Sequence, residues 1–172
     1  ITEIGIEEVS GESSTVDAAV TLEDQPMRPE FDVTLAYNPA SVVVPVARVE
    51  GIGFTLLAAA TGGSFIAGQG GVVRLDGSAD PIGPRALYLR LGSAAAELTG
   101  KSRAAQWMLL QQVIDEARGR VGPDSPHALL TPAGRRTLAD YLAGKGRIII
   151  EVDRASDIRQ LLRWSAREKV KI

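Results

Sequence analysis

Continuous apolar runs alternate in this sequence with segments whose apolar residues recur at helical spacing, and few folds accommodate that alternation. One run extends from Gly53 to Ala60 between glycines, and a second, Ile148 to Ile150, follows Gly146. Uninterrupted apolar runs of this kind are typical of strands buried on both faces, as in parallel sheets. Together with the intervening helical segments they predict an α/β protein made of parallel β/α units.

Three helices are expected from spacing and capping residues. Residues 102–118 carry apolar side chains on one helical face. Thr131 and Pro132 have the residue types favoured at an N-cap and a first helical position, and Gly144 provides the end of that helix. A short helix is expected from Pro45 to Val49.

A last helix is expected after the second apolar run, with Ser156 as its N-cap. Its predicted buried stripe consists of Ile158, Leu161, Leu162 and Ala166. The arginines Arg159, Arg163 and Arg167 recur every four residues and are expected on its solvated side. At the other end of the chain, residues 1–6 alternate with period two and predict a half-buried strand, followed by a long loop up to Phe31.

Composition limits the possible functions. The 172 residues are 45% hydrophobic and 23% charged, which predicts one ordinary globular domain over residues 1–172. The formal net charge of −2 predicts no nucleic-acid partner. The longest apolar run is far below the ~20 residues that span a bilayer, so no membrane segment is expected. Because the chain starts at Ile1 inside a strand-like pattern, we expect an internal piece of a longer protein.

Residues able to bind a transition metal are scarce. The sequence contains one histidine, His127, in a turn-rich loop, and no cysteine. A zinc site needs three or four nitrogen, sulfur or carboxylate ligands, so no metal site is expected within this chain. A lone loop histidine is more often a surface residue than a ligand or a base.

The end of the second apolar run carries the strongest candidate site. Glu151, Asp153 and Arg154 follow Ile150 directly and precede a helix. Ligands of parallel β/α folds bind at the carboxyl ends of the strands, so Glu151 and Asp153 are candidate catalytic residues. The alternative is an ion pair together with a helix-capping aspartate.

A glycine cluster at residues 62–71 follows the first apolar run. It lacks the order G-x-G-x-x-G and a Lys-Ser/Thr pair, and an apolar strand from Val72 is expected after it rather than a helix. We therefore expect a tight backbone crossing between two strands, with some glycines at positive φ, and no phosphate site.

Three linked motifs resemble the imidazolonepropionase-like branch of the amidohydrolase superfamily. They are Asn38-Pro39 with the segment from Val44 to Gly51, the stretch GGSFIAGQGGVVRLDG, and EVDRASDI. The resemblance covers most of residues 35–77 and 100–172. It implies part of a TIM-like (β/α)8 barrel, which periodicity alone does not distinguish from an open doubly wound sheet.

The resemblance also implies a function. Such proteins are metal-dependent hydrolases of C–N bonds other than peptide bonds, and their paired histidines on the first barrel strand would lie outside this chain. Glu151 stands where relatives carry a histidine. Asp153 would share the barrel mouth with it, Arg154 would bind a substrate carboxylate, and Gly68 and Gln69 would line the rim.

Two functions therefore remain open. In the first, the parent protein hydrolyses a small-molecule substrate with zinc or a similar divalent metal, and this chain alone is inactive. In the second, the parent is a catalytically silent barrel that serves as a binding or scaffold protein. A homo-oligomer is compatible with both functions, and the compartment stays open between cytoplasm and periplasm.

Overall fold

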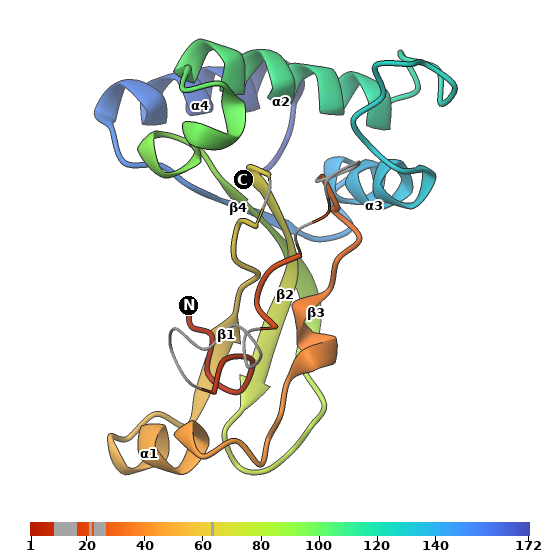
Figure 1. Ribbon diagram of the computed structural model, residues 1–172. Helices are drawn as coiled ribbons and strands as arrows, with labels where there is room; N and C mark the ends of the chain where they lie inside the picture. Colours follow the sequence, from red (N-terminus) through yellow and green to blue (C-terminus); the bar gives the residue numbers. More distant parts are fainter. Residues whose placement is uncertain (9–16, 21, 23–26, 63) are drawn as a thin grey trace.

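Four strands form one mixed sheet in the order β1-β2-β3-β4 (Figure 1). Figure 1 shows the computed structural model, which describes residues 1–8, 17–20, 22, 27–62 and 64–172. The strands are β1 (Phe54–Leu57), β2 (Ile66–Arg74), β3 (Ile82–Arg90) and β4 (Arg147–Glu151). β1 pairs with β2 and β2 with β3 in antiparallel fashion, whereas β3 and β4 are parallel. The fold is therefore mixed α/β, with a curled, half-barrel sheet.

The expectation of parallel units throughout is wrong for the first three strands. The segment between β1 and β2 is residues 58–65, and the one between β2 and β3 is residues 75–81. A parallel crossover needs a dozen or more residues, so segments this short return the chain antiparallel. Only the connection from β3 to β4, which contains α2 and α3, is long enough to make the neighbouring strands parallel.

The glycine cluster is part of a strand rather than a crossing between strands. β2 begins at Ile66, before the predicted start at Val72, and runs through Gly68, Gly70 and Gly71. Gly68 has a φ of 122°, as expected for some of these glycines. Gly63 lies outside the described residues.

The helices occur close to where the sequence predicts them. They are α1 (Val43–Val49), α2 (Arg103–Ala117), α3 (Pro132–Leu142) and α4 (Ala155–Glu168). Ser102 and Thr131 cap α2 and α3 by accepting hydrogen bonds from Ala105 N and Gly134 N. Short 3-10 helices occur at η2 (Val33–Ala36), η3 (Ser93–Ala95) and η4 (Glu97–Thr99).

Three expectations about the chain ends are wrong. α4 begins one residue before Ser156 and has Arg154 at its N-cap position, without a capping side chain. Its buried side chains are Asp157, Leu161 and Trp164. Of the predicted stripe, Leu161 is buried, whereas Ile158, Leu162 and Ala166 face solvent. Residues 1–6 form isolated β-bridges, such as Thr2 with Leu57, rather than a strand.

Both faces of the sheet are covered by apolar side chains. Alternate residues of β3 point to opposite faces, as strand geometry requires. Leu87 and Leu89 pack with the side chains of α2, α3 and α4, whereas Ala86 and Tyr88 pack with the N-terminal segment and β1. α1 lies at the far end of the molecule from α2 and α4 (Figure 1). Among the described helices, none is both long and apolar enough to cross a membrane.

Candidate active site

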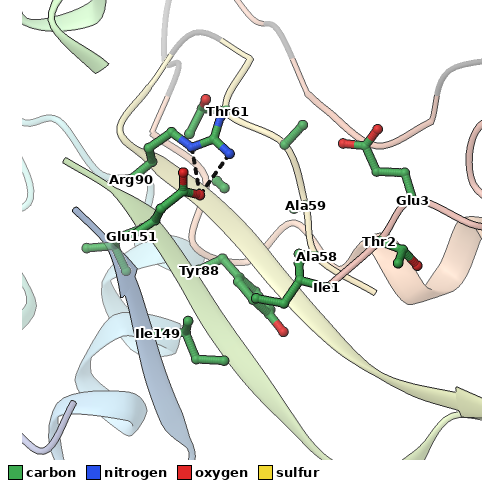
Figure 2. A pocket seen from close by; sticks show the side chains of 13 residues that line it. Ile1, Thr2, Glu3, Ala58, Ala59, Thr61, Tyr88, Arg90, Ile149 and Glu151 are labelled. Carbon is green, nitrogen blue, oxygen red and sulfur yellow. Dashed lines mark hydrogen bonds and ion pairs between the residues drawn. The ribbon is translucent and has the colours of Figure 1, made fainter. Parts of the chain in front are cut away.

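A cavity of about 360 Å³ opens at the carboxyl ends of β1, β3 and β4 (Figure 2). β2 runs in the opposite direction, so its first residues reach the same end of the sheet. The residues that line the cavity come from the N-terminal segment and from all four strands or their extensions; they are Ile1, Thr2, Glu3, Ala58, Ala59, Ala60, Thr61, Ala67, Tyr88, Leu89, Arg90, Ile149 and Glu151.

The N-terminal segment forms one wall because it is hydrogen-bonded to β1 and its extension. Thr2 N donates to Leu56 O at 3.0 Å, and Ala58 N donates to Thr2 O at 3.4 Å. The hydroxyls of Thr2 and Thr55 lie 2.8 Å apart. Small side chains, such as Ala59, line the adjoining wall and leave room for a ligand.

An ion pair forms the polar wall of the cavity. Arg90 and Glu151 are register partners at the ends of the parallel strands β3 and β4. Arg90 donates from Nε and Nη2 to Glu151 Oε2, at 3.1 and 2.8 Å. The side chains are 41% and 66% exposed, so both charges are accessible to a ligand. Within the described part of the chain, Glu151 Oε1 accepts no hydrogen bond.

Glu3 adds a second carboxyl group, on the wall across from this pair (Figure 2). Burial raises the pKa of Glu3, and the hydrogen bond to Glu7 and the charge of Glu7 raise it further, while the charge of Arg90 acts in the opposite direction. Two carboxyl groups therefore lie in the wall of one cavity, an arrangement that general acid–base chemistry can use.

Asp153 is not among the residues that line this cavity. Its Oδ2 accepts hydrogen bonds from the hydroxyl and the backbone N–H of Ser93, and Arg103 lies 3.8 Å from Oδ1. The hydrogen bond from the Ser93 hydroxyl, in particular, lowers the pKa of Asp153. A Cβ on Gly92 would overlap the Asp153 carboxylate. Asp153 thus holds the turn after β3, while Arg154 is an exposed residue at the start of α4.

Gly68 and Gln69 lie away from the cavity as well. A Cβ on Gly68 would lie 2.7 Å from the carbonyl oxygen of Phe31. Gln69 donates to Glu30 O at 3.3 Å and accepts from the Tyr141 hydroxyl at 2.9 Å. It lines a second cavity, of about 260 Å³, near the start of β4.

Sequence reasoning thus named Glu151, which lines this cavity, but missed Arg90, Glu3 and Tyr88, which line it as well. The signal for Arg90 and Tyr88 lies in the stretch from Leu87 to Arg90, where apolar and polar-tipped side chains alternate as in a strand. Glu3 carries no comparable signal, because its place in the cavity depends on long-range pairing with β1.

The described residues do not fit a metal ion. They contain no group of three or more His, Cys, Asp or Glu side chains placed to bind one. His127 is an exposed loop residue whose carbonyl accepts a hydrogen bond from Gln112 at 2.8 Å.

Comparison with solved structures finds a similar fold in an amidohydrolase from Thermotoga maritima MSB8, with a TM-score of 0.74 and 16% sequence identity. The match covers 97% of this chain and 47% of that one, so the chain spans about half the length of this neighbour. No family model matches the sequence. A search of curated proteins finds no significant match either. The amidohydrolase-like fold is thereby confirmed, while the imidazolonepropionase-like branch stays a prediction.

Proposed function

We propose that this chain supplies part of the substrate pocket of an amidohydrolase-like hydrolase that acts on C–N bonds other than peptide bonds. The observation that carries the proposal is the cavity at the carboxyl ends of β3 and β4, lined by Arg90 and Glu151. Barrel enzymes place their active sites at this end of the strands. The fold shared with an amidohydrolase agrees with the reaction class.

The cavity suits a small cyclic amide. Glu151 Oε1 is available to accept a proton from an attacking water or a hydrogen bond from the ring N–H, because Arg90 contacts only Oε2. Arg90 orients the carboxylate with two N–H groups on one oxygen. Glu3, on the wall across from this pair, is the candidate donor of a proton to the departing nitrogen when the C–N bond breaks.

The test uses the protein made from the complete reading frame that contains this sequence. It is incubated with hydantoin, dihydrouracil and 2-pyrrolidone, and ring opening is followed by mass spectrometry as the gain of one water. We expect at least one of these cyclic amides to be opened, and the opening to be lost in Glu151→Gln. Absence of ring opening with all three compounds, with and without added zinc, would overturn the proposal.

A catalytically silent barrel that binds a ligand is the second candidate function. Glu151, which stands where relatives of the resembled branch carry a histidine, favours it. Elemental analysis of the dialysed full protein separates the candidates, since stoichiometric zinc favours the hydrolase. Binding of cyclic amides without any ring opening, by a protein that retains no metal, favours the silent barrel.

A further inference from the structure

Two buried tyrosines, one on β3 and one on α3, differ in whether the hydroxyl group has a hydrogen-bond partner. Tyr88 and Tyr141 are 5% and 7% exposed. The Tyr141 hydroxyl donates to Gln69 Oε1 at 2.9 Å. The Tyr88 hydroxyl is buried and has no hydrogen-bond partner among the described residues. A buried hydroxyl group without a partner is uncommon, because it loses its hydrogen bonds to water and gains none in return.

Tyr88 lies in the wall of the cavity that contains Arg90 and Glu151. Its ring packs against Gly70 of β2. A Cβ added at Gly70 would lie 2.9 Å from the ring carbon Cε2 of Tyr88. Figure 2 shows the side chain reaching from β3 toward Ile1 and Ala58, away from the ion pair. Tyr88 and the ion pair therefore line two separate parts of one cavity.

The chemistry of the Tyr88 hydroxyl is that of a hydrogen-bond donor. Burial raises the pKa of Tyr88 to about 12, so the group stays protonated at neutral pH. Several other residues of the cavity wall, such as Ala58, Ala67 and Ile149, are apolar. Arg90 carries the one Lys or Arg side chain among the residues that line the cavity, and it is already paired with Glu151, which disfavours an anionic partner. A neutral acceptor such as a carbonyl oxygen fits these conditions.

We infer that Tyr88 is a ligand-binding residue whose hydroxyl donates a hydrogen bond to a carbonyl oxygen of a small neutral ligand in this cavity. The inference rests on the proposed function, since it takes the cavity to be the substrate pocket. It adds a specificity-determining contact on the side of the pocket opposite the ion pair.

The test measures binding of 2-pyrrolidone, a cyclic amide with one carbonyl, to the full protein by NMR titration. The variant is Tyr88→Phe, which removes only the hydroxyl. Tyr141→Phe is the matched control, because Tyr141 is equally buried and its hydroxyl is already partnered outside this cavity. Melting temperatures are measured for both variants.

We expect Tyr88→Phe to weaken binding roughly three- to ten-fold, as loss of one neutral hydrogen bond does. Its melting temperature should not fall, because no hydrogen bond among the described residues is lost. Tyr141→Phe should bind 2-pyrrolidone as the wild type does and melt at a lower temperature. A normal affinity in Tyr88→Phe would show that the hydroxyl serves structure or water only, and would overturn the inference alone.

The outcomes separate the inference from the proposed function. If 2-pyrrolidone binds with the expected loss in Tyr88→Phe but no cyclic amide is opened, the hydrolase proposal fails and the binding role of Tyr88 stands. The wild-type protein is titrated with 2-pyrrolidone up to about 100 times a millimolar Kd. If it shows no binding there, the inference is overturned together with the pocket.

Discussion

The α-carbon of Gly70 lies so close to the backbone of Leu57 that a Cβ at Gly70 would overlap the Leu57 carbonyl oxygen. The same Cβ would lie 2.9 Å from the ring of Tyr88. β1, β2 and the tyrosine of β3 therefore meet at a point that has no room for a side chain. The glycine at position 70 is thus explained by close packing between β1, β2 and Tyr88.

Substituting Gly70 by alanine should destabilise the fold. The clash involves the backbone of β1 and a buried ring, so neither neighbour moves without disturbing the sheet. We expect a loss of about 1 to 3 kcal/mol in the free energy of unfolding, the usual cost of overpacking. Urea denaturation measures it. Gly53→Ala is the matched control, because a Cβ there meets nothing within 4 Å, and an equal loss in both variants would contradict the packing explanation.

Glu116 is expected to be among the most sensitive positions of α2. The residue is 1% exposed, and its carboxylate accepts hydrogen bonds from the backbone N–H groups of Leu129 and Leu130. Arg135 lies 3.3 Å from Oε2. Glu116→Ala removes the acceptor of two backbone N–H groups and the charge that pairs with the mostly buried Arg135 guanidinium, and should cost about 3 to 5 kcal/mol.

The control for Glu116 is its neighbour Asp115, which pairs with Arg120 and is 27% exposed. Asp115→Ala should cost at most about 1 kcal/mol, as expected for a more exposed pair. The two variants are compared by urea denaturation under the same conditions. Similar losses would show that Glu116 does not anchor the segment from 118 to 130.

Local sequence features predicted the helices because capping and spacing act within one or two turns. Ser102 and Thr131 cap α2 and α3 as their residue types indicate. β3 was not predicted, since Pro84 and Arg85 interrupt its apolar pattern and its pairing with β2 and β4 is long-range. Strand direction was wrong for the same reason: an apolar run indicates burial, whereas the length of the connection decides the direction.

Only part of the candidate site followed from sequence position. Glu151 was identified because it ends an apolar strand, and the structure places it in a cavity wall. Asp153 has the same residue type two positions later, but Ser93 and Arg103 hold it outside that cavity. Arg90 was missed, because register in a parallel sheet, which the sequence does not reveal, brings it beside Glu151.

Under the proposed function, Glu151→Gln should lower activity strongly and leave the stability of the fold nearly unchanged. The ion pair with Arg90 is largely exposed, so its loss should change the unfolding free energy by less than about 1 kcal/mol. Loss of the carboxylate that accepts a proton should lower ring opening by about 100-fold or more. Glu97→Gln, which removes the exposed pair with Lys101, is the control and should change neither quantity. A large fall in melting temperature for Glu151→Gln would mark the pair as structural.

The carboxylate of Glu168 ties the end of α4 to α2. Arg167 Nε donates to Oε1 at 3.0 Å, and Arg118 contacts Oε2 and also donates to the Glu168 carbonyl at 2.7 Å. The hydrogen bond from Arg167, followed by that from Arg118 and the charges of both, lowers the pKa of Glu168 below its ordinary value of 4.5. The Glu168 side chain is only 10% exposed, which limits screening of these contacts by solvent.

This lowered pKa predicts how stability depends on pH. Above pH 4.5 the carboxylate is ionised in both the folded and the unfolded chain, so the stabilisation is complete. As pH falls below that value the unfolded chain takes up the proton first, and the stabilisation is lost as pH passes through the folded pKa. Glu168→Gln should lose about 1 to 3 kcal/mol at pH 7, the range for hydrogen bonds to a charged group. It should also show a shallower fall in stability between pH 4.5 and pH 2. Arg118→Gln should change the acid slope in the same direction, and an unchanged slope in both variants would contradict the role given to this contact.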